Sequence, residues 1–385
     1  MRPLLVCALA ALSLALVACK KDGGGGGGGS AKATGTKIGL VTDVGGRGDQ
    51  SFNDGALRGL ENWAAGKKYA TGGYVALPAA DLAKSVPDDL KATATITPLP
   101  IQPVVLQAKQ QEDYEPNLQL LVDEGVKLSI AVGFMLENAV ESAAKKNPGS
   151  HFLLIDSPIL DKGGMPYPLP NVRSVTFREQ EGTFLVGALA GLATKSNVVG
   201  FVGGMQIPLI RRFEAGFRAG VMTTNPEAAK NLLVGYTGSF DKVEAGKQVA
   251  QDMISKSADV LFHAAGSDGL GVITAAKEAK KWAIGCDSDQ HHVAPDAVVT
   301  SFIKHVDYAV YQAAAEVAAG KFTAGQVELG LKEGGVGYSP LGLDKLPNKE
   351  AIVAQVEALR KMIVDGQIKV PANADELASF KPPTR

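Results

Sequence analysis

The 385-residue sequence has few cysteines, few aromatic residues and no excess of charge of either sign. Its 3 cysteines and 6% aromatic residues disfavour a disulfide framework and an aromatic-rich β-sandwich. Lys and Arg number 39 against 40 Asp and Glu, so the chain lacks the basic excess that binds nucleic acid by releasing counterions. The length suits about two domains.

Catalytic and cofactor motifs are also scarce. None of the 5 histidines lies in a Gly-x-Ser-x-Gly or similar context. The turn at residues 45–48 lacks the Gly-Lys-Ser/Thr of a phosphate loop and the third glycine of a dinucleotide fingerprint. Metal-ligand types gather at residues 286–292, but their spacing fits no standard zinc or calcium pattern. We expect no enzyme activity, no metal and no cofactor.

The N-terminus predicts a lipoprotein signal. The apolar stretch 4–18 is too short for a stable membrane-spanning helix and is typical of a signal-peptide core. Leu16-Val17-Ala18-Cys19 resembles the bacterial lipobox. We predict a signal peptide at 1–18, lipidation of Cys19, and a Gly-rich tether over 19–36 that leaves the protein anchored to a bacterial membrane at the cell envelope, in the periplasm or on the outer face.

From Lys37 onward, short apolar runs alternate with helical segments. Strands are expected at residues 38–43, 128–133, 151–156, 172–177, 198–203, 232–236, 258–264, 282–286, 298–303 and 326–332. Helices are expected between them and at the C-terminus. This alternation predicts an α/β fold of two Rossmann-like lobes, each a parallel sheet flanked by helices.

The two lobes are expected to be joined by a multi-strand hinge. We assign residues 37–171 plus 288–322 to the N-terminal lobe, and residues 172–287 plus 323–385 to the C-terminal lobe. Residues 72–112 are rich in proline and show no clear periodicity, which predicts a surface insertion on the first lobe.

Polar residues gather where the predicted strands end. They include Asp43, Gly133, Asp156, Asp287 and Lys304. Each aspartate alone is better explained as a helix N-cap or a turn residue, but ligands of α/β sheets bind at the carboxyl ends of strands. The repeated coincidence predicts a ligand cleft between the lobes.

Two phenylalanines are candidates for that cleft. Phe52 lies among polar residues at a loop-to-helix junction, where it either anchors the helix or presents its ring to a ligand. Phe213 is a candidate for the opposite face. Stacking of a base on an aromatic ring contributes about 1–3 kcal/mol.

Several segments, in order along nearly the whole mature chain, resemble the basic membrane protein family, the bacterial purine nucleoside receptor lipoproteins with the type I periplasmic-binding-protein fold. They are residues 37–43, 49–53, 133–134, 213–221, 263–266, 284–290 and 300–304. The resemblance implies a monomeric substrate-binding protein that captures purine nucleosides for an ABC permease and its ATPase.

The resemblance also implies roles for residues at the base end of the cleft. Phe52 and Phe213 would sandwich the purine, and Asp43 and Asn53 would line the cleft. Asn138 follows the motif that begins at Gly133, at a position where relatives commonly have aspartate, so it implies a changed contact to the base.

At the sugar end, the resemblance implies that Gly266, Asp287 and Lys304 bind the ribose. Asp287 and Lys304 would also neutralise each other in the closed cleft. Two alternatives stay open. One is a receptor for a sugar or another small polar metabolite, and the other is a nucleoside-cleaving hydrolase that uses Asp287 and Asp289.

Overall fold

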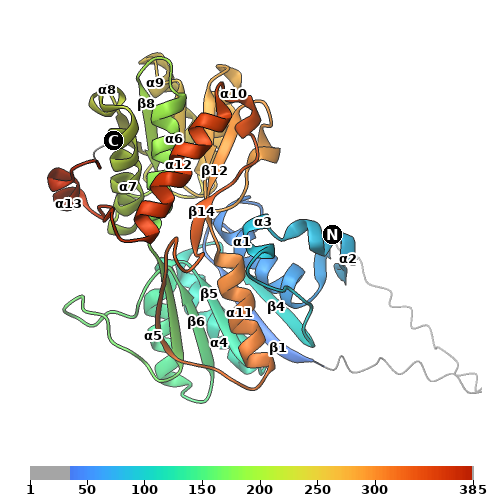
Figure 1. The fold of residues 1–385 in the computed structure, drawn as a ribbon. Helices are drawn as coiled ribbons and strands as arrows, with labels where there is room; N and C mark the ends of the chain where they lie inside the picture. The colour runs from blue at the N-terminus through green and yellow to red at the C-terminus, as the bar shows by residue number, and fades with distance from the viewer. Residues whose placement is uncertain (1–34, 384–385) are drawn as a thin grey trace, which may run out of the picture. The chain divides into compact units, whose positions relative to one another are not determined.

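The computed structural model describes residues 35–383 (Figure 1). The predicted signal peptide, Cys19 and the tether up to residue 34 lie outside the described residues. Within residues 35–383 the strands form two six-stranded sheets and one two-stranded hairpin, β2 (Lys67–Ala70) with β3 (Gly73–Ala76). The two large sheets confirm the α/β prediction.

The first sheet has the order β13-β7-β6-β5-β1-β4, and all its strands are parallel. Its strands are β1 (Thr36–Thr42), β4 (Ile101–Gln107), β5 (Leu128–Val132), β6 (His151–Ile155), β7 (Val172–Phe177) and β13 (Gly325–Leu329). The helices packed with it include α1 (Phe52–Leu57), its π-helical continuation η1 (Arg58–Ala64), α4 (Tyr114–Asp123), α5 (Glu137–Lys146) and α11 (Val306–Ala318).

The second sheet has the order β14-β12-β11-β10-β8-β9, in which only β14 runs antiparallel to its neighbour. Its strands are β8 (Val199–Gly203), β9 (Leu233–Tyr236), β10 (Val260–Ala264), β11 (Trp282–Gly285), β12 (Val298–Lys304) and β14 (Val336–Tyr338). Its helices are α6 (Glu179–Ala193), α7 (Pro208–Thr224), α8 (Pro226–Lys230), α9 (Val243–Ser255), α10 (Asp268–Glu278), α12 (Lys349–Val364) and α13 (Ala374–Ser379).

Short helical turns complete the described chain. They are α2 (Ala79–Ser85), α3 (Asp88–Lys91), η2 (Gln111–Asp113), η3 (Phe134–Leu136), η4 (His291–Val293) and η5 (Leu343–Lys345). No helix among the described residues has both the length and the apolar character needed to cross a membrane.

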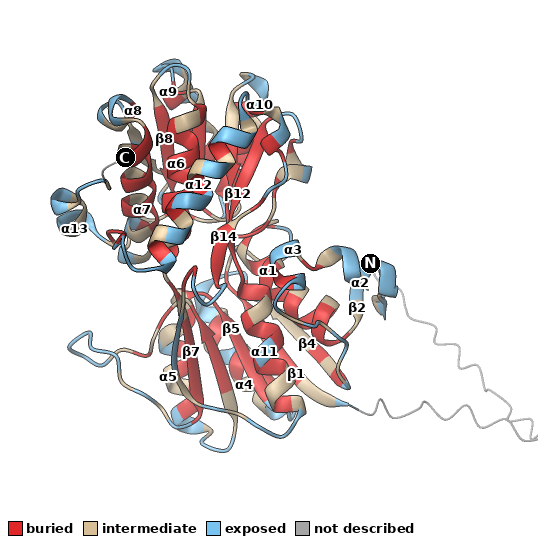
Figure 2. Ribbon diagram, in the orientation of Figure 1, coloured by how far each residue is buried: buried red, intermediate tan, exposed pale blue. Residues whose placement is uncertain are grey.

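The central strands are buried on both faces, as Figure 2 shows. Every residue of β5, β8, β10 and β12 is buried. On β1, Ile38 and Leu40 pack in the cluster that includes Leu60 of η1, whereas Val41 packs with Leu118 of α4. Because successive side chains point to opposite faces of a strand, helices on both sides of the sheet are held by one short apolar run.

The Gly- and Ala-rich sequence of α6 and α7 lets these two helices approach closely. A Cβ atom on Gly220 of α7 would lie 2.0 Å from the carbonyl oxygen of Phe184 in α6. A side chain there would force the helices apart, so helix packing requires glycine at residue 220.

The sheets divide the chain differently from the prediction. β7, expected to open the C-terminal lobe, pairs with β6 and β13 in the first sheet, so the chain first crosses after Phe177 instead of near Asn171. β12, expected in the N-terminal lobe, lies in the second sheet, and the chain returns after Lys304. Apolar patterns identify strands, but sheet membership depends on which strand edge is free to pair.

Residues 72–112 are also more than a surface insertion. Residues 101–107 form β4, which pairs with β1 along its whole length at the edge of the first sheet. Pro103 lies within this strand. Proline disfavours a strand prediction, but an edge strand tolerates it because one side of the strand needs no hydrogen-bond donors.

Candidate ligand-binding site

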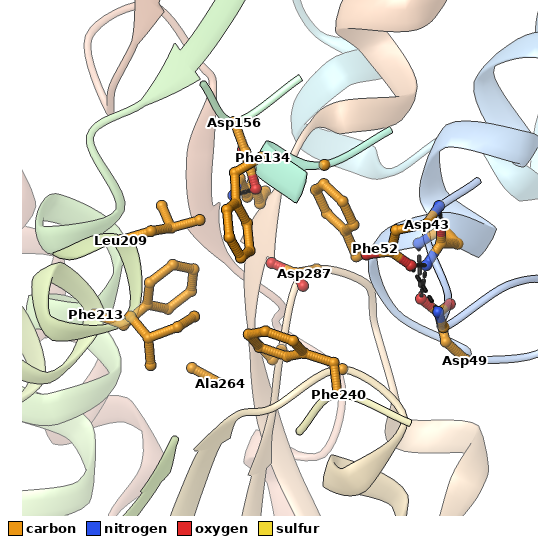
Figure 3. Close-up of a pocket in the computed structure, with 17 residues that line it drawn as sticks. Asp43, Asp49, Phe52, Phe134, Asp156, Leu209, Phe213, Phe240, Ala264 and Asp287 are labelled. Carbon is orange, nitrogen blue, oxygen red and sulfur yellow. Dashed lines mark hydrogen bonds and ion pairs between the residues drawn. The ribbon is translucent and has the colours of Figure 1, made fainter. Parts of the chain in front are cut away.

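One pocket collects the carboxyl ends of strands from both sheets (Figure 3). The space between its atoms is about 550 Å³, including the part open at the mouth. Its lining residues are Asp43, Gly45, Asp49, Phe52, Asn53, Gly133, Phe134, Asp156, Leu209, Ile210, Phe213, Phe240, Ala264, Gly266, Cys286, Asp287 and Lys304. Eight of the nine residues selected from the sequence are in this set.

Aromatic rings form one part of the lining. Figure 3 shows Phe52, Phe134, Phe213 and Phe240 directed toward the same space. Phe134 of η3 and Phe240, which follows β9, meet edge to face with ring centroids 6.3 Å apart and an interplanar angle of 70°. η3 follows β5 of the first sheet, and Phe240 follows β9 of the second sheet. This ring pair therefore bridges the two sides of the pocket.

Phe52 and Phe213 do line one pocket, but they are not equivalent. Phe52 is half-buried, whereas Phe213 is only 3% exposed. Phe213 packs edge to face on Phe302 of β12, with centroids 5.2 Å apart. Its ring is therefore also part of the core of the second sheet.

Asp43 and Asn53 form a buried polar corner with Asp49. Asn53 donates from Nδ2 to Asp43 Oδ1 at 2.7 Å and to Asp49 Oδ2 at 3.0 Å. The backbone amides of Ser51, Asn53 and Asp54 donate to the Asp49 carboxyl, which fixes the turn before α1. Burial raises the pKa of Asp49 to about 7 and also raises the pKa of Asp43.

Gly133 gives the backbone its close approach to this corner. Its φ of +112° is in the region that favours glycine, and a Cβ atom would lie 3.3 Å from Asp43 Oδ2 and 3.4 Å from Phe52 Cε1. A side chain at residue 133 would therefore press on both the carboxyl and the ring.

Lys304, the last residue of β12, lies at the charged end of the pocket. Its side chain is only 1% exposed, and its Nζ lies 2.7 Å from Asp156 Oδ2 and 3.1 Å from Glu179 Oε1. Burial alone would lower the pKa of Lys304, but Asp156, Glu179 and Asp287 outweigh burial and raise it. The ammonium is therefore charged at all physiological pH values.

The predicted ion pair between the Lys304 ammonium and the Asp287 carboxylate is wrong. The ammonium pairs with Asp156 and Glu179, and the hydrogen bond between Lys304 and Asp287 joins their backbones, N to O, at 3.0 Å. Asp156 follows β6 in the first sheet, so the ion pair joins the two sheets. The sequence could not show that the strand end facing Lys304 is that of β6.

The Asp287 carboxyl has a different partner. Ser51 donates from Oγ to Asp287 Oδ2 at 3.1 Å and to the Cys286 carbonyl at 2.9 Å, and Ser288 Oγ donates back to the Ser51 carbonyl at 2.8 Å. Asp287 Oδ1 is buried without a hydrogen-bond partner among the described residues. Burial raises the pKa of Asp287.

Asn138 does not reach the pocket. It is exposed on α5 and is absent from the lining. The structure therefore does not bring it to the pocket as the resemblance implied: Asn138 is the second residue of α5, which begins after the turn η3, and its side chain is exposed.

The sequence identified Asp156 only as a strand-end residue and Phe134 only within a segment of the family resemblance, and it did not identify Phe240. Phe240 follows β9 in Gly238-Ser239-Phe240, an aromatic residue just beyond a strand end, which is the signal that could have identified it. Gly266, at φ +55°, lies against the backbone and ring of Phe240.

The other side chains that the sequence offered as candidates for chemistry make structural contacts. Asp289 accepts from the His291 amide at 2.8 Å and from Ser339 Oγ, His291 Nδ1 lies 3.0 Å from the Val298 carbonyl, and His292 Nε2 lies 2.8 Å from Gln50 Oε1. Within residues 35–383 no group of three potential metal ligands is close enough to hold an ion. Burial raises the pKa of the Cys286 thiol, so it stays protonated at neutral pH.

Comparison with known proteins places this geometry in context. Residues 36–374 match the Bmp family, described as ABC transporter substrate-binding protein PnrA-like. The "CD4+ T-cell-stimulating antigen" of Listeria monocytogenes is 36% identical, over 87% of this chain and 87% of that protein. The "ABC transporter nucleoside-binding protein BmpA" of Lactococcus lactis is 34% identical, over 96% of this chain and 99% of that protein.

A solved structure supports the same relation. The ABC transporter solute-binding protein of Aeropyrum pernix K1 is 28% identical, with a TM-score of 0.69, and the match covers 89% of this chain and 96% of that one. The strand order and the pocket described above thus occur in a chain similar to solute-binding proteins.

Proposed function

The chain belongs to the Bmp family of ABC transporter substrate-binding proteins, and on that premise we propose that it captures purine nucleosides in the pocket between its two sheets. The permease and ATPase of an ABC importer are then its partners. The observation that carries the proposal is that one pocket combines aromatic rings with buried charged groups: Lys304 Nζ lies 5.3 Å from the centroid of the Phe52 ring and 5.4 Å from that of Phe213. A nucleoside likewise joins a flat base to a hydroxylated sugar.

The aromatic end suits a heterocycle. The half-buried rings of Phe52, Phe134 and Phe240 offer apolar faces at which a base loses contact with water. Stacking on such a ring contributes about 1–3 kcal/mol. Asp43 and Asn53 adjoin the rings and can hydrogen-bond the edge of the base.

The charged end suits the pentose. Lys304 and Asp287 supply a donor and an acceptor, and the Asp287 Oδ1 atom has no partner among the described residues. A buried carboxylate oxygen without a partner costs about 1–3 kcal/mol or more, and a ligand hydroxyl would remove that cost. This end alone also suits a free sugar, which keeps the sugar-receptor alternative testable.

The hinge and the anchor complete the proposal. The chain crosses between the sheets after β7, after β12 and after β13, and we assign the closing motion of the two lobes to these segments. Lipidation of Cys19 would keep the protein at the cell envelope near its permease. Loss of membrane fractionation in the Cys19→Ala variant tests the anchor.

Calorimetry of the purified protein with inosine, guanosine and adenosine tests the ligand. We expect saturable heat for at least one of them, and no heat for any of the three would overturn the purine assignment. Ribose that competes as strongly as the nucleoside would favour a sugar receptor. Free base released on incubation with nucleoside would instead show a hydrolase.

A further inference from the structure

The polar end of the pocket holds a second carboxylate that the family resemblance did not select. Asp156 follows β6 and lines the pocket, and its side chain is only 6% exposed. One of its oxygens, Oδ2, is committed to Lys304 at 2.7 Å. The other oxygen, Oδ1, is buried and has no hydrogen-bond partner among the described residues.

The neighbours of Lys304 show that Asp156 is not needed merely to neutralise the ammonium. Glu179 Oε1 lies 3.1 Å from the same Nζ, and its other oxygen, Oε2, accepts from Arg212 Nη1 at 3.1 Å. The charged groups at this end are therefore two cations, Lys304 and Arg212, against three carboxylates, Glu179, Asp156 and Asp287. Carboxylates therefore outnumber cations at this end of the pocket.

Two of these carboxylates each have one oxygen atom without a hydrogen-bond partner. Asp287 Oδ1 and Asp156 Oδ1 are both buried, both lack a partner among the described residues, and both belong to pocket-lining residues. They approach the pocket from the second and the first sheet, because Asp287 follows β11 and Asp156 follows β6. Two unpartnered acceptors on residues that line one pocket suit a ligand with two hydroxyl groups, each of which can donate one hydrogen bond.

We infer that Asp156 binds a sugar hydroxyl directly and, together with Asp287, selects ribonucleosides over deoxynucleosides. The inference rests on the proposed function and deepens it. A site built to hydrogen-bond a hydroxyl discriminates strongly against a ligand that lacks it, because a buried polar atom is then left unpaired. Because each sheet contributes one of the carboxylates, a bound sugar would contact both sheets.

The test is calorimetry with inosine and its 2′-deoxy, 3′-deoxy and 2′,3′-dideoxy counterparts, or with the adenosine series if inosine gives no heat. For the unaltered protein we expect each single deoxy ligand to bind at least tenfold more weakly. For Asp156→Asn we expect at least a tenfold loss for the ribonucleoside and less than threefold for the dideoxy ligand. The control Asp296→Asn alters a side chain that is 93% exposed and should leave every affinity within twofold.

Equal losses for the ribonucleoside and the dideoxy ligand would overturn the inference, because Asp156 would then only position Lys304. An unchanged affinity would overturn it as well. If Asp156→Asn fails to fold, the ligand series on the unaltered protein decides: deoxy ligands within threefold of the ribonucleoside refute the selectivity. No heat from any nucleoside would refute the proposed function instead, so the two failures are distinguishable.

Discussion

The two ends of the pocket hold their side chains in different ways. At the charged end, Lys304 is fixed by Asp156 from the first sheet and Glu179 at the start of α6, and all three side chains are almost fully buried. At the aromatic end, Phe52, Phe134 and Phe240 are half-buried and lie at the starts of short helical segments or in a loop. A rearrangement at the charged end would leave a charge unpaired, whereas a rearrangement of the rings would change only apolar and ring contacts.

On the proposed function, this difference gives the two ends separate tasks. The charged end suits the recognition of a feature that all ligands share, such as the pentose. The aromatic end, with Asp43 and Asn53 beside it, suits the part that varies, the base. Substitutions at the two ends should therefore differ in their effects on stability and on ligand preference.

Removal of the charge of Lys304 should have the largest effect. In Lys304→Met, the carboxylates of Asp156 and Glu179 lose their shared cation, so we expect a loss of about 3–5 kcal/mol in the free energy of unfolding and at least a hundredfold loss of nucleoside affinity. Urea unfolding measures the loss of stability, and calorimetry measures the loss of affinity. The control Lys361→Met removes a side chain that is 75% exposed, and it should change neither. Retained affinity in Lys304→Met would contradict the charged-end assignment.

A comparison of Phe213 with Phe52 sharpens the description of the aromatic end. Because Phe213 packs in the core, Phe213→Ala should cost about 3–5 kcal/mol of unfolding free energy. Phe52→Ala should weaken nucleoside binding at least tenfold, which is the loss of about 1.4 kcal/mol of stacking, with a smaller effect on stability. Thermal unfolding and calorimetry of both variants separate the roles. An unchanged affinity in Phe52→Ala would remove its stacking role.

A pH dependence should come from His305, which follows Lys304 and is buried. Its Nε2 lies 2.9 Å from Asp89 Oδ2 on α3 and its Nδ1 lies 3.4 Å from Asp307 Oδ1, while Arg58 also pairs with Asp307 at 2.7 Å. The two carboxylates outweigh burial and raise the pKa of His305 to about 9. Its stabilising effect is complete below the unfolded pKa of about 6.5 and is lost as the pH rises through about 9.

Asp89→Asn should reveal this dependence. Asp89 is partly exposed, so we expect a destabilisation of only about 1 kcal/mol at pH 6 that disappears by about pH 10. Urea unfolding across that range measures it, with Asp88→Asn, an exposed neighbour, as the control. A constant difference at all pH values would show that the Asp89–His305 pair is not responsible. The variant also tests whether the contact between Asp89 on α3 and His305 stabilises the end of β12, where Lys304 lies.

The smallest effect is expected at Asn138, which is exposed on α5 away from the pocket. Asn138→Ala should leave nucleoside affinity within twofold. Its matched counterpart, Asn53→Ala, removes the bridge between Asp43 and Asp49 and should cost about 1–3 kcal/mol of unfolding free energy. A clear change in base preference in Asn138→Ala would contradict its placement outside the aromatic end.

Much of the site was visible in the sequence because parallel strands bring their carboxyl ends to one edge. Asp43, Phe52, Gly266 and Lys304 were identifiable from that rule and from the family resemblance, and the structure places all four on one pocket. Pro103 concealed β4, because proline argues against a strand unless the strand is known to be at an edge.

The sequence alone determined the α/β class, the positions of most strands and the set of polar residues at their ends, because these follow from local apolar patterns and turn chemistry. The tertiary structure decided which sheet each strand joins, that Asp156 instead of Asp287 meets Lys304, that Phe213 belongs partly to the core and that Asn138 lies outside the pocket. The physical reason is that partners far apart in the chain are set by the packing of whole strands and helices, which no local pattern encodes.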